Sequence, residues 1–198
     1  DEAEATTHRP RPMTRWGWTV GAGLALGCAA APPAPAPAPV TPVAPARDYL
    51  VLIAAEATDQ ITLARFGAGA PKVERVQLTG LNPNEPDGPH GLAVAPGGAT
   101  FAHGTPFGSL WKYNTATGAQ LGRVELGSFP ASMQVTPDGH YVFVVNFNLH
   151  GDMVPSSVSI VAAAQMLEVA RVETCTMPHG SRLNAAGTRQ YSTCMMDE

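Results

Sequence analysis

Between Asp48 and Glu198, short runs of apolar, β-branched and aromatic residues alternate with turns rich in Gly and Pro. The runs are strand-length, and the turn residues return about every eight to ten positions. A sustained helical period is absent. The stretch AAAQMLEVA, from Ala162, comes nearest and is interpreted as a turn that leads into a strand. The pattern predicts an all-β fold, namely a sandwich, a barrel or a propeller.

A ten-residue frame occurs three times and narrows this choice. It reads PHGLAVAPGG from Pro89, PASMQVTPDG from Pro130 and PHGSRLNAAG from Pro178, so the copies start 41 and 48 residues apart. The middle copy continues into YVFVVN, and Asp-Gly between two apolar runs predicts a tight hairpin. Four antiparallel strands in a repeat of roughly forty to fifty residues are typical of one blade of a β-propeller.

The sequence of the repeat resembles that of a known family. TPDGHYVFVVN, followed by SSVSIV, is similar to the YVTN-type β-propeller repeat P-x-G-V-A-V-S-P-D-G-K-x-V-Y-V-T-N, which continues V-S-V-I-D. The copies at Pro89 and Pro178 resemble it more loosely, with APGG and NAAG at the turn. The resemblance covers residues 48–198 and implies a β-propeller of four-stranded antiparallel blades. It says little about activity, because propellers include binding proteins, lactonases and redox enzymes.

About three blades are expected in this sequence. Three strands belong to a first blade, two complete blades follow, and the residues after Pro178 supply two strands of a fourth. A closed propeller of this family needs about seven blades. We therefore expect an open fragment of a longer propeller, or a chain that must assemble with another.

Residues 1–47 differ in character. Arginines precede an apolar run of residues 16–27, which is too short to span a bilayer and is typical of a secretory signal. ALGC, ending at Cys28, resembles the bacterial lipobox, so we predict lipidation of Cys28; cleavage within residues 29–31 is the alternative. A Pro/Ala-rich linker occupies residues 28–47. The predicted localisation is the periplasm or the cell surface, with the membrane reached only through the lipid anchor.

The charge of the chain is low and slightly acidic. Twelve Lys and Arg residues against sixteen Asp and Glu give a net charge of −4, and the basic residues form no cluster. A nucleic-acid surface needs a concentrated basic patch. The composition therefore argues against nucleic-acid binding.

Histidines mark one face of the predicted propeller. His90 and His179 begin innermost strands at equivalent positions, whereas Ala131 occupies this position in the middle copy. The loop that follows YVFVVN brings further polar residues to the same face, and His140 belongs to the opposite face. The predicted ligand-binding face consists of Asp87, His90, His150, Asp152 and His179. These histidines either cap the channel as structural residues or bind a metal or cofactor on its axis.

The hairpin predicted after Pro178 places two cysteines near His179. If Ala185 pairs with Thr188 across the turn, the residue opposite His179 is Cys194, and Cys175 lies four residues before His179. A Cys175–Cys194 disulfide is expected in an exported protein. Two reduced thiols without a role, or a soft-metal site, are the alternatives. The candidate metal ligands are His90, His179, Cys175 and Cys194, suited to copper or another transition metal.

Two functions are compatible with these features. The first is an envelope-anchored β-propeller lipoprotein that binds a protein or small-molecule ligand on its channel-mouth face. The second is a periplasmic redox or metal-dependent enzyme with axial histidine ligands, as the resemblance to the propellers of nitrous oxide reductase and cytochrome d1 implies. Neither a C-x-x-C-H haem attachment motif nor a nucleophile elbow occurs in the sequence.

Overall fold

A computed structural model describes residues 45–77 and 88–197 of the chain. All regular structure in these residues is β, apart from two short 3-10 turns, Glu56–Thr58 and Pro96–Gly98. In chain order the strands are β1 (Tyr49–Ala55), β2 (Gln60–Phe66), β3 (Lys72–Gln77), β4 (Leu92–Val94), β5 (Thr100–Gly104), β6 (Ser109–Asn114), β7 (Gln120–Glu125), β8 (Pro130–Val135), β9 (Tyr141–Asn146), β10 (Pro155–Ala162), β11 (Leu167–Thr176), β12 (Pro178–Leu183) and β13 (Gln190–Cys194).

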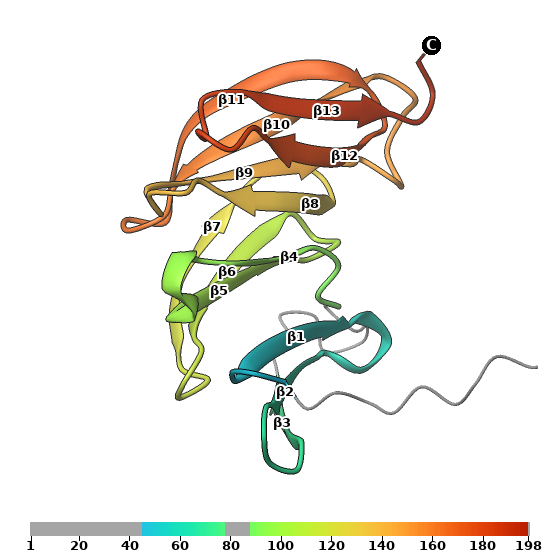
Figure 1. Ribbon diagram of the computed structural model, residues 1–198. Helices are drawn as coiled ribbons and strands as arrows, with labels where there is room; N and C mark the ends of the chain where they lie inside the picture. The colour runs from blue at the N-terminus through green and yellow to red at the C-terminus, as the bar shows by residue number, and fades with distance from the viewer. Residues whose placement is uncertain (1–44, 78–87, 198) are drawn as a thin grey trace, which may run out of the picture. The chain divides into compact units, whose positions relative to one another are not determined.

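The strands form four antiparallel sheets, each built from consecutive strands (Figure 1). We call them the first sheet (β1–β3), the second sheet (β4–β7), the third sheet (β8–β11) and the fourth sheet (β12–β13). The prediction of an all-β fold with four-stranded antiparallel units is confirmed by the second and third sheets. Within the described residues, no helix is long and apolar enough to cross a membrane.

The hairpin between β8 and β9 shows why the local sequence folds as it does. Gly139 adopts a φ of 76°, a conformation that costs glycine little, and its N–H donates to the carbonyl of Thr136. The Asp138 carboxylate accepts from the Thr136 hydroxyl at 2.5 Å and from the His140 N–H at 3.0 Å. The Asp-Gly pair therefore closes the turn that the sequence predicts.

Alternate residues of the second sheet contribute to two separate cores. Phe101 and Trp111 pack with Ile61 of the first sheet, whereas their neighbours Ala102 and Leu110 pack with residues of the third sheet. This follows from the two-residue period of a strand, which sends successive side chains to opposite faces. The central strands β5 and β6 are therefore covered on both faces, whereas β7 is mostly exposed.

A backbone feature repeats at the start of β4, β8 and β12. The residue before the Pro of each frame has a positive φ: 38° at Gly88, 55° at Phe129 and 52° at Met177. Positive φ is uncommon for residues other than glycine. The same bend at three equivalent positions shows that the repeat extends one residue upstream of the frame, into positions where the amino acid differs each time.

Candidate functional site

Three histidines and two phenylalanines lie together in the structure. They come from the segments at the starts of β4, β8 and β12 and from the residues that follow β9. His90 lies edge-on to Phe129, with ring centroids 4.8 Å apart, and His179 lies edge-on to Phe147 at 4.7 Å. The two phenyl rings meet at 5.8 Å, and His150 contacts Phe129 at 5.6 Å. Edge-to-face geometry at these distances is favourable for aromatic pairs. We call these five residues the His–Phe cluster.

Backbone hydrogen bonds fix this cluster in place. The N–H of Phe147 donates to the carbonyl of Phe129 at 2.9 Å, so the residues that flank β8 and β9 are tied together. The N–H of His90 donates to the carbonyl of Gly104 at 3.0 Å, and its Nδ1 lies 3.2 Å from a carboxylate oxygen of Glu56. Both phenyl rings are buried, whereas His90 and His179 are partly exposed and His150 is exposed. The imidazoles are accessible while their positions are set by the phenyl rings beneath them.

Beside the cluster runs a groove of about 730 Å³, lined by residues of β4, β8, β12 and β13. His90 belongs to both the groove and the cluster. The polar side chains of the groove include Gln134, Ser181 and Arg182, and its lining contains no carboxylate. The groove therefore offers a ligand hydrogen-bonding groups and one guanidinium, beside the apolar side chains that also line it.

The structure brings His90, His150 and His179 to one cluster, and it places His140 beside the β8–β9 turn, with its Nδ1 3.1 Å from a carboxylate oxygen of Asp138. Asp152 lies in the exposed loop between β9 and β10, where its backbone carbonyl accepts from the Asn148 amide. Asp87 and Cys28 lie outside the residues that the structure describes.

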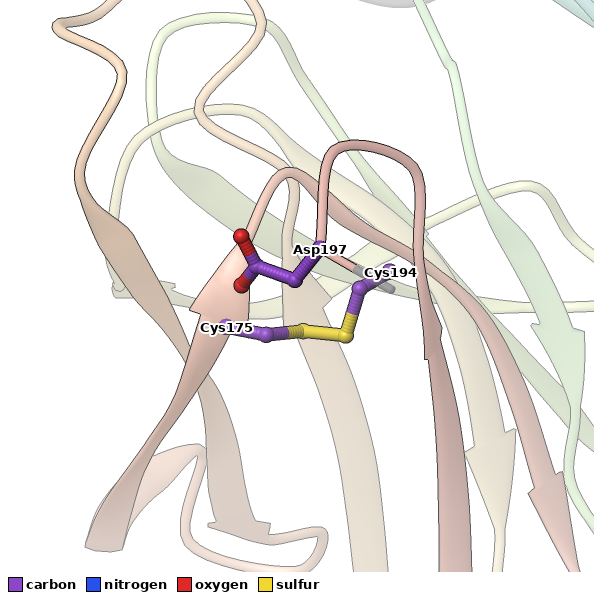
Figure 2. Close-up of side chains that lie close together, drawn as sticks. All are labelled: Cys175, Cys194 and Asp197. Atoms are coloured by element: carbon purple, nitrogen blue, oxygen red, sulfur yellow. A yellow bond between two sulfur atoms is a disulfide. The ribbon is translucent and has the colours of Figure 1, made fainter.

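A disulfide joins Cys175 to Cys194, with Cα atoms 6.0 Å apart (Figure 2). The bond links the end of β11 to the end of β13. Asp197 lies beside it, and its carboxylate accepts from the Thr176 N–H at 2.6 Å.

The expected position of Cys194 opposite His179 is wrong. From Gly180 to Leu183 the hairpin has the predicted register, with Gly180 opposite Thr193. A bulge between Pro178 and Gly180 then shifts the pairing, so that Cys194 faces Pro178. A β-bulge places two residues of one strand against one of its partner, and His179 is the extra residue here.

The four candidate metal ligands do not form one group. Among the described residues, the ligand atoms of Cys175, Cys194 and Asp197 lie within 4.8 Å of one another, and no histidine joins them. His179 turns instead toward the ring of Phe147, because the bulge removes it from the position opposite Cys194. The two sulfur atoms are bonded to each other and are not thiolates in this state.

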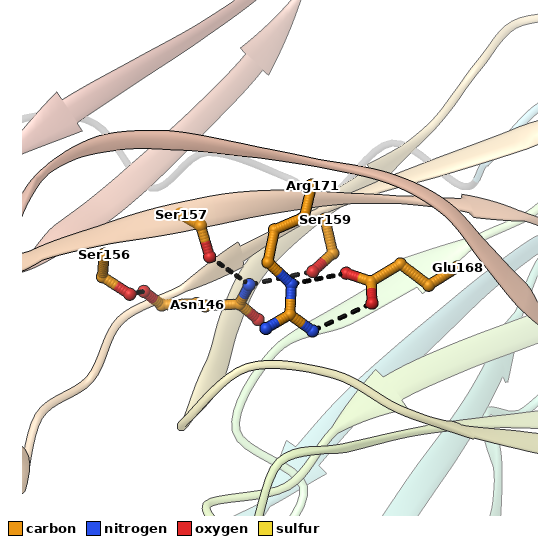
Figure 3. A network of polar contacts seen from close by, with 6 residues as sticks. All are labelled: Asn146, Ser156, Ser157, Ser159, Glu168 and Arg171. Carbon is orange, nitrogen blue, oxygen red and sulfur yellow. Dashed lines mark hydrogen bonds and ion pairs between the residues drawn. The ribbon is translucent and has the colours of Figure 1, made fainter.

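The sequence does not single out Asn146, which is fully buried at the end of β9. Its amide nitrogen donates to the hydroxyls of Ser157 and Ser159 at 2.9 and 2.8 Å, and its backbone carbonyl accepts from the Ser156 hydroxyl (Figure 3). Arg171 of β11 forms a two-pronged ion pair with Glu168 at the edge of this network. The contacts between Asn146 and the serines tie β9 to β10.

His103 in β5 is the second residue that the sequence does not reveal. It is 2% exposed and stacks on Tyr113, with ring centroids 5.5 Å apart. Burial lowers the pKa of His103 to about 4, and the contact of Nδ1 with the Gly104 carbonyl opposes this only in part. His103 is therefore neutral near neutral pH. It belongs to the core and does not line the groove.

Comparison with known proteins leaves the family open. No family model matches the sequence, and no curated protein matches it. Among solved structures, the chain is similar to hydrazine synthase of Kuenenia stuttgartiensis, with a TM-score of 0.56 and 16% identity. The match covers 70% of this chain and 39% of that chain. A structure of U3-55K matches with a TM-score of 0.47 and 16% identity, over 53% of this chain and 32% of that one. At 16% identity the likeness to hydrazine synthase concerns the fold alone.

Proposed function

We propose that residues 48–198 form blades of a β-propeller. This assignment is supported by the two complete four-stranded meanders. It is also supported by the three copies of the Pro-x-Gly or Pro-x-Ser frame and by the YVTN-like repeat sequence. The packing of consecutive sheets on each other's faces also supports it. In this arrangement β4, β8 and β12 are the innermost strands, and the groove between them is part of the central channel.

We propose that this domain is a binding module whose ligand occupies the groove beside the His–Phe cluster. The ligand is a small molecule or a protein segment that carries a negative charge. The observation that carries this proposal is the lining itself, which combines Arg182, the Gln134 amide and the His90 imidazole with no carboxylate. A guanidinium in a groove that lacks acidic groups favours carboxylate or phosphate ligands.

We further propose that the domain is exported and held at the envelope by a lipid on Cys28. The lipobox-like ALGC and the Pro/Ala-rich linker support this. A linker of this composition is semi-rigid and extended, so it would hold the domain away from the membrane. The groove would then be accessible to ligands in the periplasm or at the cell surface.

A fluorine NMR fragment screen tests the binding proposal, with equal numbers of carboxylic acids and neutral analogues of matched size. We expect the acids to supply most of the hits and to bind about tenfold more weakly to an Arg182→Gln variant, which loses a charge-assisted hydrogen bond. Arg189→Gln is the matched control, because Arg189 lies in the β12–β13 turn and does not line the groove. Equal hit rates for acids and neutral analogues, or equal weakening in both variants, would contradict the proposal.

A further inference from the structure

A second cavity lies between the second and third sheets. Its volume is about 140 Å³, and it is lined by residues of β4, β5 and β6 on one side and by residues of β8, β9 and the β10–β11 turn on the other. Ala93 and Val135 line both this cavity and the groove, whereas the groove residues Gln134 and Arg182 do not line the cavity. It is therefore a separate site, and we call it the inter-sheet cavity.

Small side chains account for the inter-sheet cavity. Its lining includes five alanines, namely Ala93, Ala95, Ala102, Ala163 and Ala164. Stacked sheets lie about 10 Å apart, so alanines that face one another leave space that larger side chains would fill. Ala93 and Ala102 are buried, whereas Ala164 is exposed. The cavity therefore has an apolar inner end and a mouth near Ala164.

Met166 gives the cavity an adaptable wall. A Cβ at Gly122 would lie 2.7 Å from the Cγ of Met166, so the methionine side chain packs directly against β7. Both the backbone of this turn and its neighbour Ala164 belong to the third sheet's β10–β11 connection. A methionine side chain is unbranched and fits irregular spaces. The wall can therefore adjust to an occupant while the strands stay in place.

Among the described residues that line the cavity, Lys112 alone carries a charge. Its neighbours Trp111 and Tyr113 pack in the core shared with the first sheet, so the two-residue period sends Lys112 toward the third sheet. Its Nζ donates to the carbonyl of Ala163 at 2.7 Å. An ammonium group has three N–H donors, so this contact leaves two for an occupant of the cavity.

The size and the charge of the cavity together define its ligand. An apolar cavity of about 150 Å³ holds a molecule the size of benzene. A neutral apolar occupant would take water from the Lys112 ammonium and give no acceptor in return, which is unfavourable. A carboxylate attached to the apolar body supplies both the acceptor and the opposite charge. An inorganic anion would not fill the part that is lined by alanines.

We propose that the inter-sheet cavity binds a small aromatic or aliphatic monocarboxylate. The apolar body of the ligand lies between the alanines, and its carboxylate accepts hydrogen bonds from the Lys112 ammonium. This site is independent of the ligand proposed for the groove, because neither Arg182 nor Gln134 takes part in it.

NMR with benzoate as the probe tests this on the full chain. Isotope-labelled alanine and methionine methyl groups report on the lining directly. We expect saturable shifts at Ala102, Ala163 and Met166, and nuclear Overhauser contacts from the ring protons of benzoate to the same methyl groups. Benzyl alcohol, a neutral analogue of the same size, should bind about tenfold more weakly, because it lacks the charge-assisted hydrogen bond.

Two variants isolate the role of Lys112. Lys112→Met keeps an unbranched side chain and should weaken benzoate binding about tenfold, while the affinity for benzyl alcohol should change little. Lys72→Met is the matched control, because Lys72 is exposed and does not line the cavity. It should bind benzoate as the unmodified protein does. The contacts to Met166 in the unmodified protein keep the test decisive if Lys112→Met does not fold.

The position of the probe decides between the cavity and the groove. Contacts from benzoate to the methyl group of Met133, which lines the groove, in place of Met166 would overturn the inference. Equal weakening in Lys112→Met and Lys72→Met, or no saturable shift at all, would also overturn it. A loss of benzoate affinity in Arg182→Gln alone would place the probe in the groove, and would thus overturn this inference while supporting the proposed function.

Discussion

The imidazole ring of His90 lies 6.2 Å from that of His179, although the two residues introduce strands of different sheets. Between the two frames, the middle copy has Ala131, which is fully buried in one core cluster with Phe129 and Phe147. A histidine side chain at position 131 would have to displace these rings. The break in the Pro-His-Gly pattern therefore has a packing reason, since the small residue makes room for the phenyl rings that support both histidines.

Phe129 is predicted to hold this cluster together. Phe129→Ala should lower the free energy of unfolding by about 3–5 kcal/mol, because it empties a buried site packed against Phe147, His90 and His150. It should also shift the NMR signals of the His90 and His150 rings. Urea unfolding measures the first effect, and Phe107→Ala, at a residue 46% exposed, is the control that should change little. A similar loss in both variants would contradict the prediction.

His103 is predicted to make stability depend on pH. Its pKa is about 4 in the fold and about 6.5 in an unfolded chain, so between these values the unfolded state binds a proton that the folded state does not. Stability should therefore fall by about 3 kcal/mol as the pH drops from 6.5 to 4, and this contribution should level off below pH 4.

A His103→Leu variant should lose this part of the slope in urea unfolding measured at several pH values. His140→Gln is the control and should keep the slope, because the His140 side chain is 75% exposed. An unchanged slope in His103→Leu would show that His103 titrates alike in both states.

Gly127 is predicted to be required by the Asn146 network. A Cβ at Gly127 would lie 2.7–3.0 Å from side-chain atoms of the buried Asn146, although the backbone there suits any residue. Gly127→Ala should cost about 1–3 kcal/mol of stability through overpacking. Gly69→Ala is the matched control, since nothing lies within 4 Å of its Cβ. In an Asn146→Ala background the cost of Gly127→Ala should shrink, and a purely additive double variant would refute the contact.

Cys28 is predicted to carry the membrane anchor. Cys28→Ser should move the mature protein from the membrane fraction to the soluble envelope fraction, because the thiol that accepts the lipid is lost. Fractionation with immunoblotting measures this, and mass spectrometry of the mature N-terminus checks the modification directly. Retention of the variant in the membrane would count against lipidation, and a mature end within residues 29–31 would favour ordinary cleavage.

The strands and most of their pairing could be predicted from the sequence, because they depend on local chemistry. The Asp138-Gly139 turn fixes the β8–β9 hairpin, and the turn at Asn184–Arg189 gives the register of Gly180–Leu183 against Gln190–Thr193. The approach of His90 and His179 follows from their equivalent positions in the repeat, and that of His150 follows from the loop after β9, which ends on the same face.

Features that depend on packing between sheets were beyond the reach of sequence patterns. The bulge at Pro178–Gly180 moves His179 by one position in the ladder, and nothing in PHGSRL signals it. The burial of Asn146 and His103 depends on neighbours from other strands, such as Ser159 and Tyr113. From the sequence alone, polar residues at the end of a strand are expected on the surface, because their neighbours from other strands are not known.

The Cys175–Cys194 bond also has a mechanical consequence. It encloses β12 and β13 in a covalent loop between two cysteines that are 19 positions apart in sequence. A pulling force applied beyond Cys194 therefore reaches β11 through the sulfur atoms, and the hairpin between them carries no tension. In a single-molecule stretching experiment, the oxidised chain should come out about 60 Å shorter than the reduced chain, the contour length of the enclosed loop. The fourth sheet, which has the fewest strands, is thus shielded from load by the bond that closes it.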